Sequence, residues 1–124
     1  MNQAALAPDT FSADCPTRRI LDRIADKWTV LILDLLLESP LRFNELLRRI
    51  GGLSQKMLSQ TLKTLERDGL VLRTAFPTVP VTVEYRITEL GVTHAETLKP
   101  LRLWAEANME AIDQAQLRYD STPR

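Results

Sequence analysis

A mainly helical domain with one small β-hairpin is the fold class that the sequence predicts, and three observations predict it. Apolar residues recur at helical spacing as far as Leu65, the period shortens to two residues between Leu70 and Thr88, and helical spacing returns after Thr88. With 124 residues, 44% of them hydrophobic, the chain has room for one core. We expect this domain over residues 15–118, a flexible tail over 1–14 and a short C-terminal tail over 119–124.

Two helices are predicted first, one from Pro16 to about Asp26 and one over Lys27–Glu38. Proline is compatible with the start of the first helix, because the missing N–H would have no partner there. The second helix is apolar almost all round, so it should be the central element of the core. Ser39 and Pro40 end it, because the residue before a proline is pushed out of the helical region.

A helix-turn-helix pair is predicted next. A short extended piece, Leu41–Phe43, leads into a helix of about eight residues over Phe43–Ile50. Gly51 and Gly52 then predict a tight turn, and Ser54 can cap a second helix that ends before a left-handed Gly69. We expect one face of this second helix to be buried, namely the face that carries Met57, Leu58, Leu62 and Leu65.

A β-hairpin and a long helix complete the chain. The strands Leu70–Phe76 and Val81–Thr88 are predicted to pair antiparallel, because the loop between them is too short for a crossover. Thr88 can cap a last helix that runs to about Leu117 and bends at Pro100.

This order of elements is that of a winged helix-turn-helix with extra N-terminal and C-terminal dimerisation helices. In such a fold the second helix of the pair enters the DNA major groove and the hairpin loop touches the neighbouring backbone or minor groove. The segment Arg42–Arg73 carries seven basic and three acidic residues, whereas the formal net charge of the whole chain is zero. We therefore predict a double-stranded DNA operator as the partner of the central segment, with an ordinary mixed surface as the alternative interpretation.

The predicted DNA contacts lie mainly on the polar face of the helix that Ser54 caps. Glutamine can pair with adenine and lysine with guanine, so base contacts are predicted for Gln55, Lys56 and Gln60. Phosphate contacts are predicted for Ser54, Ser59, Lys63, Arg48 and Arg49, and contacts from the hairpin for Thr78 and Thr82. The alternative is a winged-helix module that binds protein instead of DNA, which the polar, lysine-bearing face disfavours.

These elements resemble the HxlR-type family of bacterial transcriptional regulators, relatives of the MarR winged-helix group. The resemblance covers about residues 15–106 and rests on the elements KWT, RFNEL, LSQ-x-x-L-S and P-x-x-P-x-x-VEY, which occur in this order. It implies a homodimer that is joined through the first and last helices and binds a near-palindromic operator. Family wings often have a second proline and a basic residue where this chain has Val81 and Thr82, which weakens the expected contact between wing and DNA.

A homodimer also has a physical argument. A twofold axis sets two recognition helices roughly 34 Å apart on one face of the duplex. The last helix has more apolar residues than a small domain can cover, and with the first helix it can supply the interface. The predicted interface residues are Ile20, Leu21, Leu101, Trp104, Ala105, Met109 and Ile112, with intramolecular core as their alternative role.

The single cysteine is a candidate sensor. Cys15 precedes Pro16 at the predicted start of the first helix, where the helix dipole, Arg18 and Arg19 favour the thiolate and Asp14 opposes it. Oxidants and electrophiles attack the thiolate. In the family that the sequence resembles, some members use a cysteine at this place to sense such compounds, sometimes through a disulfide between subunits. We expect control either by modification of Cys15 or by a small ligand, with a chemically inert cysteine as the alternative.

Several classes of protein are not expected. One cysteine excludes an intramolecular disulfide, and His94 has no second His or Cys at ligand spacing, so we expect no metal site, no cofactor and no enzyme. The longest apolar stretch, Trp28–Leu37, has about ten residues, whereas a membrane span needs roughly 20. The first fourteen residues contain no Lys or Arg and no apolar run, so we expect a cytoplasmic protein without a membrane partner.

Overall fold

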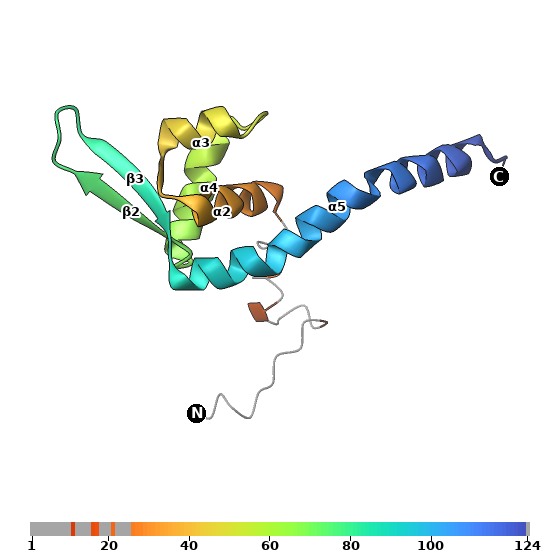
Figure 1. The fold of residues 1–124 in the computed structure, drawn as a ribbon, viewed down its shortest axis with the longest axis horizontal. Helices are drawn as coiled ribbons and strands as arrows, with labels where there is room; N and C mark the ends of the chain where they lie inside the picture. Colours follow the sequence, from red (N-terminus) through yellow and green to blue (C-terminus); the bar gives the residue numbers. More distant parts are fainter. Residues whose placement is uncertain (1–10, 12–15, 18–20, 22–25, 124) are drawn as a thin grey trace, which may run out of the picture.

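The computed structural model describes residues 11, 16–17, 21 and 26–123 (Figure 1). Of the predicted first helix it describes Pro16, Thr17 and Leu21, which are helical, and Asp26, which is extended and caps the next helix. The rest of that helix, Ile20 included, lies outside the described residues, as does Cys15. The elements in chain order are α2 (Lys27–Glu38), β1 (Leu41–Arg42), α3 (Phe43–Arg49), α4 (Gln55–Arg67), β2 (Val71–Phe76), β3 (Thr82–Ile87) and α5 (Glu89–Ser121).

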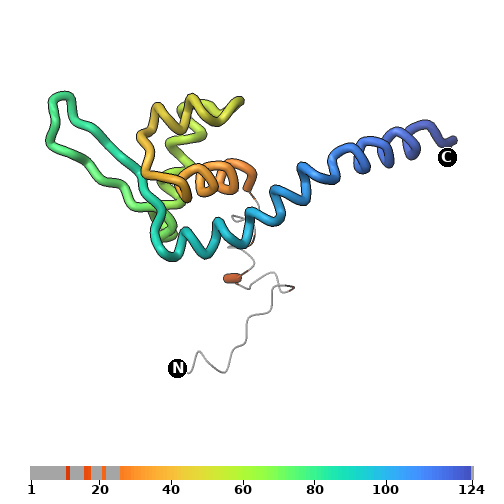
Figure 2. Tube along the Cα trace, viewed as in Figure 1, coloured from red at the N-terminus to blue at the C-terminus, as the bar shows by residue number. Residues whose placement is uncertain are grey.

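Helix α2 is the centre of the core. Its residues Ile32 and Leu33 are fully buried, and the helix contacts α4, α5 and β3. Figure 2 shows α2 crossing between the helix pair on one side and the first part of α5 on the other. The predicted central helix is therefore confirmed, with the predicted bounds.

The predicted antiparallel hairpin is confirmed, and it belongs to a sheet of three strands in the order β1-β3-β2. The register pairs Val71 with Ile87 and Phe76 with Thr82. The short extended piece predicted over Leu41–Phe43 contains the third strand, β1. Its pairing with β3, Leu41 opposite Tyr85 and Arg42 opposite Glu84, was not predicted.

Side chains alternate between the two faces of this sheet. Val71 is buried, and Tyr85 lies on the same face at 9% exposure, so this face packs on the core. Leu72 points to the opposite face and is 54% exposed. We name this opposite surface the outer sheet face; the register places Arg42, Glu84, Thr74, Arg86, Leu72, Thr82 and Phe76 on it.

Three predicted helix caps are confirmed. The Ser54 hydroxyl accepts from the Met57 N–H at 3.1 Å, and the Thr88 hydroxyl accepts from the Gly91 N–H at 3.0 Å. Gly69 has a φ of +78°, and the Leu70 N–H donates to the Leu65 carbonyl at 2.9 Å, so α4 ends as the sequence predicts. A fourth cap was missed: the Asp26 carboxylate accepts from the Thr29 N–H at 3.0 Å and begins α2.

Helix α5 is longer than predicted. It has 33 residues, about 50 Å at the normal rise per residue, and continues past Leu117 to Ser121. It runs without a break through Pro100 and changes direction part-way along (Figure 2). Its buried residues, Gly91, Ala95 and Leu98, all lie in the first three turns, and Figure 1 shows the remainder extending away from the rest of the described chain.

This architecture is a winged helix-turn-helix: α3 and α4 are the helix pair, and β2 and β3 are the wing. Among the described residues, no helix is both long enough and apolar enough to span a lipid bilayer.

Candidate nucleic-acid interface

Helix α4 carries a continuous polar stripe on the side that faces away from the core. Leu58, Leu62 and Leu65 on its inner side are at most 2% exposed. Residues spaced by four, three and four along a helix lie above one another on one face. On the outer side this spacing aligns four exposed side chains, Lys56, Gln60, Lys63 and Arg67, which we name the α4 stripe.

The stripe contains three of the predicted contacts and one residue that was missed. Lys56, Gln60 and Lys63 were predicted, whereas Arg67 was counted only in the basic excess of this segment. A helical-wheel projection of α4 would have found Arg67, because it lies eleven residues, about three turns, after Lys56. The stripe thus has three cations and one amide.

Ser54, Gln55 and Ser59 lie beside the stripe at the start of α4. Gln55 and Ser54 are exposed, and Ser59 is half-buried. Since the Ser54 oxygen accepts the capping bond from Met57, its hydroxyl hydrogen can still donate to a phosphate. Met57 is 41% exposed, which corrects its predicted burial: it lies on the flank of α4, outside the contact between Leu58 and the core.

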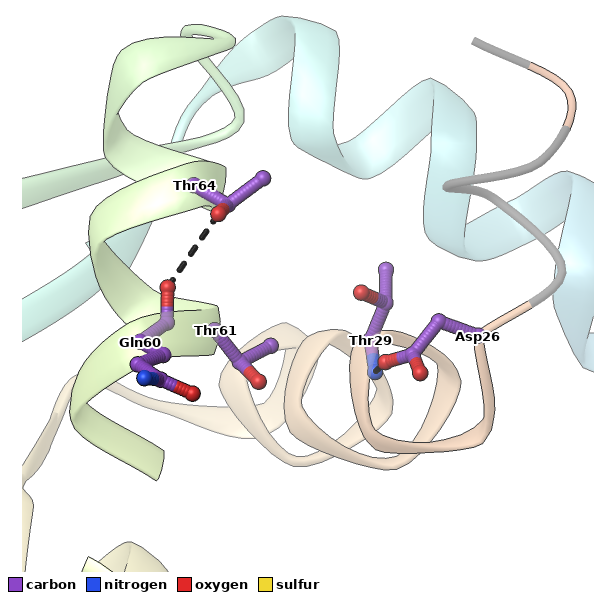
Figure 3. Close-up of a pocket in the computed structure, with 5 residues that line it drawn as sticks. All are labelled: Asp26, Thr29, Gln60, Thr61 and Thr64. Carbon is purple, nitrogen blue, oxygen red and sulfur yellow. Dashed lines mark hydrogen bonds between the residues drawn. The ribbon is translucent and has the colours of Figure 1, made fainter. Parts of the chain in front are cut away.

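A polar pocket of about 200 Å³ separates α4 from the start of α2 (Figure 3). Figure 3 shows Thr61 projecting from α4 toward Thr29, which lies in the first turn of α2 next to its cap, Asp26. The Thr61 hydroxyl donates to the Met57 carbonyl at 2.8 Å, and the Thr64 hydroxyl donates to the Gln60 carbonyl at 3.2 Å. Both hydroxyl hydrogens are donated within α4, so they are not available to a ligand in the pocket. We therefore assign the pocket to the packing between α2 and α4.

The two predicted arginines of α3 face different surroundings. Arg49 forms an ion pair with Glu38 at 3.5 Å and lines a pocket that also includes Arg102 of α5. Arg48 lines a groove with Arg42 of β1. The structure therefore places Arg48 on the side of the wing and Arg49 on the side of α2 and α5.

The predicted wing residues Thr78 and Thr82 are bonded to each other. Their hydroxyl oxygens lie 2.9 Å apart, and the Thr78 hydroxyl also lies 2.8 Å from the Pro80 carbonyl oxygen. The Thr78 N–H donates to the Phe76 carbonyl at 2.8 Å. These contacts tie the exposed Thr78 of the loop between β2 and β3 to the half-buried Thr82 at the start of β3.

The predicted interface residues on α5 are largely uncovered. Leu101 is 57% exposed, Trp104 56% and Met109 51%, Ala105 is also exposed, and Ile112 is half-buried. Leu21, the one predicted interface residue of the first helix that is described, is 50% exposed. The apolar stripe of α5 therefore has little cover from the described residues.

His94, in the first turns of α5, is a half-buried base. Its Nε2 is buried without a hydrogen-bond partner among the described residues. Burial lowers the pKa of His94 below the ordinary value of 6.5, and the negative charge of Asp68 offsets part of this effect. Among the described residues, no three His, Cys, Asp or Glu side chains cluster in a way that could hold a metal ion.

Acid is expected to weaken the fold through His94. The unfolded chain binds a proton near pH 6.5 and the folded chain only at lower pH, so stability is lost as the pH falls from above 6.5 toward the lowered pKa. Thermal unfolding of the wild type and His94→Gln from pH 7.5 to pH 5.5 measures this contribution. The variant should lose less stability over that range; parallel losses would exclude His94 as the cause.

Comparisons with known proteins agree with this geometry. A family model described as HxlR-like helix-turn-helix matches residues 23–113. The HTH-type transcriptional regulator YtfH of Escherichia coli (strain K12) is 41% identical over 112 residues, which cover 90% of this chain and 89% of that protein.

Two solved structures extend the comparison. A ytfH transcriptional regulator from Salmonella typhimurium superimposes with a TM-score of 0.83 at 37% identity, over 89% of this chain and 98% of that one. The redox regulator HypR in its reduced form superimposes with a TM-score of 0.72 at 33% identity, over 80% of this chain and 98% of that one. The fold and the order of its elements are therefore shared with transcriptional regulators.

Proposed function

The chain belongs to the HxlR-like helix-turn-helix family of transcriptional regulators, and from this premise we propose that it binds a near-palindromic promoter operator as a homodimer. In this proposal α4 of each subunit lies in one major groove and the wing lies against the adjacent backbone or minor groove.

The α4 stripe is the observation that carries the proposal. Its lysines and Arg67 are exposed and form no ion pair within the described part of the chain. Their charges are thus available for phosphates or for guanine edges, and the Gln60 amide can pair with adenine. Gln55 and Lys56, in the first turn of α4, are best placed for base edges because the start of a recognition helix points into the groove.

The homodimer is supported by the uncovered apolar stripe of α5. An exposed stripe that includes Trp104, Leu101 and Met109 is costly in water, and a second copy of the same helix can cover it. The family resemblance implies the same arrangement, with the first helix contributing Ile20 and Leu21. Two copies of α4 would then read two half-sites about 34 Å apart.

Salt dependence and two alanine variants test the proposal. If each subunit neutralises about three phosphates, log K for operator binding falls with log salt at a slope of roughly −5. Lys63→Ala should weaken binding to all duplexes alike and flatten the slope by about 1.8, because the dimer loses two contacts. Gln55→Ala should instead relax specificity at one base position and leave the slope unchanged. Fluorescence anisotropy on operator and random duplexes measures both effects.

A slope near zero for the wild type would contradict a complex anchored on phosphates. Equal losses on operator and random duplex for both variants would refute the division between base and phosphate contacts. A gel shift with genomic fragments separates this function from a winged-helix module that binds only protein, because such a module would retain no fragment.

Control through Cys15 is a second part of the proposal. The similar protein HypR is a redox regulator, and Cys15 precedes a predicted helix start flanked by Arg18 and Arg19. Diamide treatment should change operator affinity several-fold in the wild type, and Cys15→Ser should remove this response. If both proteins respond equally, Cys15 is not the sensor and the remaining candidate is a small ligand.

A further inference from the structure

A wide polar groove lies between α3 and the outer sheet face. It has a volume of about 530 Å³ and is lined by Arg42, Asn44, Glu45, Arg48 and Glu84. Asn44 and Arg48 are four residues apart on α3 and share one side of that helix. Arg42 and Glu84 face each other across β1 and β3. The groove is thus formed by one side of α3 and by the outer sheet face.

Both acidic side chains of the groove are already engaged. The Glu45 carboxylate accepts from the Arg42 backbone N–H at 3.0 Å. The Glu84 carboxylate lies 3.6 Å from the Arg86 guanidinium. Each carboxylate therefore has a partner other than the Arg42 and Arg48 guanidinium groups.

The two guanidinium groups of the groove are left without ion pairs within the described part of the chain. Arg42 and Arg48 are both exposed, and so is the Asn44 amide between them in sequence. Guanidinium groups bind phosphate oxygens through two parallel N–H donors, and an amide N–H adds a neutral donor. The groove therefore presents a donor set suited to a phosphate diester.

The outer sheet face extends from the groove to the wing. Thr82 lies on the same outer sheet face as Arg42 and Glu84, and its hydroxyl is paired with that of Thr78 at the tip. Figure 1 shows α3 and the free end of the wing on the same side of the molecule. In a winged-helix complex, the recognition helix lies in the major groove and the wing lies at the adjacent minor groove. The sugar-phosphate backbone between these two grooves must therefore pass between the helix pair and the wing.

We propose that the groove between α3 and β3 binds the DNA backbone, with Arg42 and Arg48 holding its phosphates and Asn44 adding a hydrogen bond. This inference rests on the proposed function and adds Arg42 and Asn44 to the contacts predicted from sequence. It also separates Arg48 from Arg49, which is paired with Glu38 on the other side of α3.

Arg42→Ala tests the groove, with Arg73→Ala as its matched control. Arg73 is also an exposed arginine of the sheet, but it pairs with Tyr85 and so lies on the other face. Operator binding is measured by fluorescence anisotropy across salt concentrations, and thermal unfolding checks that each variant is folded. Arg42→Ala should weaken binding roughly tenfold or more at 0.1 M salt, on operator and random duplex alike, and flatten the salt slope by about 1.8 per dimer.

Three further variants sharpen the test. Arg48→Ala should behave like Arg42→Ala. Arg42→Lys should keep the salt slope, because the charge remains, and lose only part of the affinity. Glu84→Gln should strengthen binding several-fold, because it removes a negative charge beside the phosphates. Arg73→Ala should change neither affinity nor slope.

Two outcomes would overturn the inference. In the first, Arg42→Ala binds as the wild type does while Lys63→Ala is impaired, which leaves the proposed function intact and removes the groove from the interface. In the second, Arg42→Ala and Arg73→Ala lose affinity equally. The loss would then depend only on the net charge of the protein and not on the groove. A wild type that binds no duplex at any salt concentration would instead refute the proposed function itself.

Discussion

Replacing Gly91 with alanine is expected to destabilise the fold by ~2–4 kcal/mol and to lower the midpoint of thermal unfolding by roughly 10 °C or more. A methyl group at this position would overlap the backbone carbonyl oxygen of Leu70 and meet the Ile87 Cγ1 at 2.6 Å. A backbone carbonyl cannot move aside as a flexible side chain can. The start of α5 would have to shift away from β2 and β3.

The contacts around Gly91 explain why such a shift is costly. The Thr88 N–H donates to the Leu70 carbonyl at 3.1 Å, and the Thr88 hydroxyl donates to the Gly69 carbonyl at 2.6 Å. Moving α5 would break these bonds and uncover Ala95, which is 4% exposed. The same change thus removes packing and leaves polar groups unpaired.

Two other glycines provide controls for this prediction. At Gly51 an added Cβ meets nothing within 4 Å and φ is not positive, so Gly51→Ala should be neutral or slightly stabilising. At Gly69 the space is open but φ is +78°, so Gly69→Ala should cost about 1 kcal/mol through backbone strain. Chemical denaturation of the three variants measures the series. A loss for Gly91→Ala no larger than that for Gly69→Ala would contradict the proposed steric cause.

Trp104→Glu is expected to raise the dissociation constant of the homodimer by about a thousandfold. Tryptophan is the residue whose truncation most often costs 2 kcal/mol or more at an interface, and the twofold axis repeats the loss in both subunits. Placing a carboxylate opposite an apolar surface adds a desolvation cost. Sedimentation velocity over a range of protein concentrations measures the change.

Leu103→Glu is the matched control for Trp104→Glu. Leu103 is 48% exposed and Trp104 56%, and consecutive residues of a helix point about 100° apart. Leu103 lies on the far side of α5 from the stripe formed by Leu101, Trp104 and Ala105. Leu103→Glu should therefore remain a dimer and bind the operator normally. Trp104→Glu should lose affinity for the full operator and keep weak binding to a half-site. Equal dimerisation of both variants would show that the α5 stripe is not the interface.

The sequence predicted the elements of the fold because their signals are local. Helix period, strand alternation and the caps at Ser54, Thr88 and Gly69 each depend on residues within one or two turns of each other. The same local pattern placed Lys56, Gln60 and Lys63 on one face of α4. The motifs in this segment were also sufficient to indicate the family.

Only the tertiary structure decided which surfaces these elements leave open. Burial depends on what packs from elsewhere in the chain, and for that reason Met57 and Leu72 are exposed although their spacing suits a core. The pairing of β1 with β3 has no local signal in a strand of two residues, yet it brings Arg42 opposite Glu84 and forms one wall of the groove. Arg48 and Arg49 are neighbours in sequence, and the helix turns them toward different parts of the molecule because successive side chains diverge by about 100°.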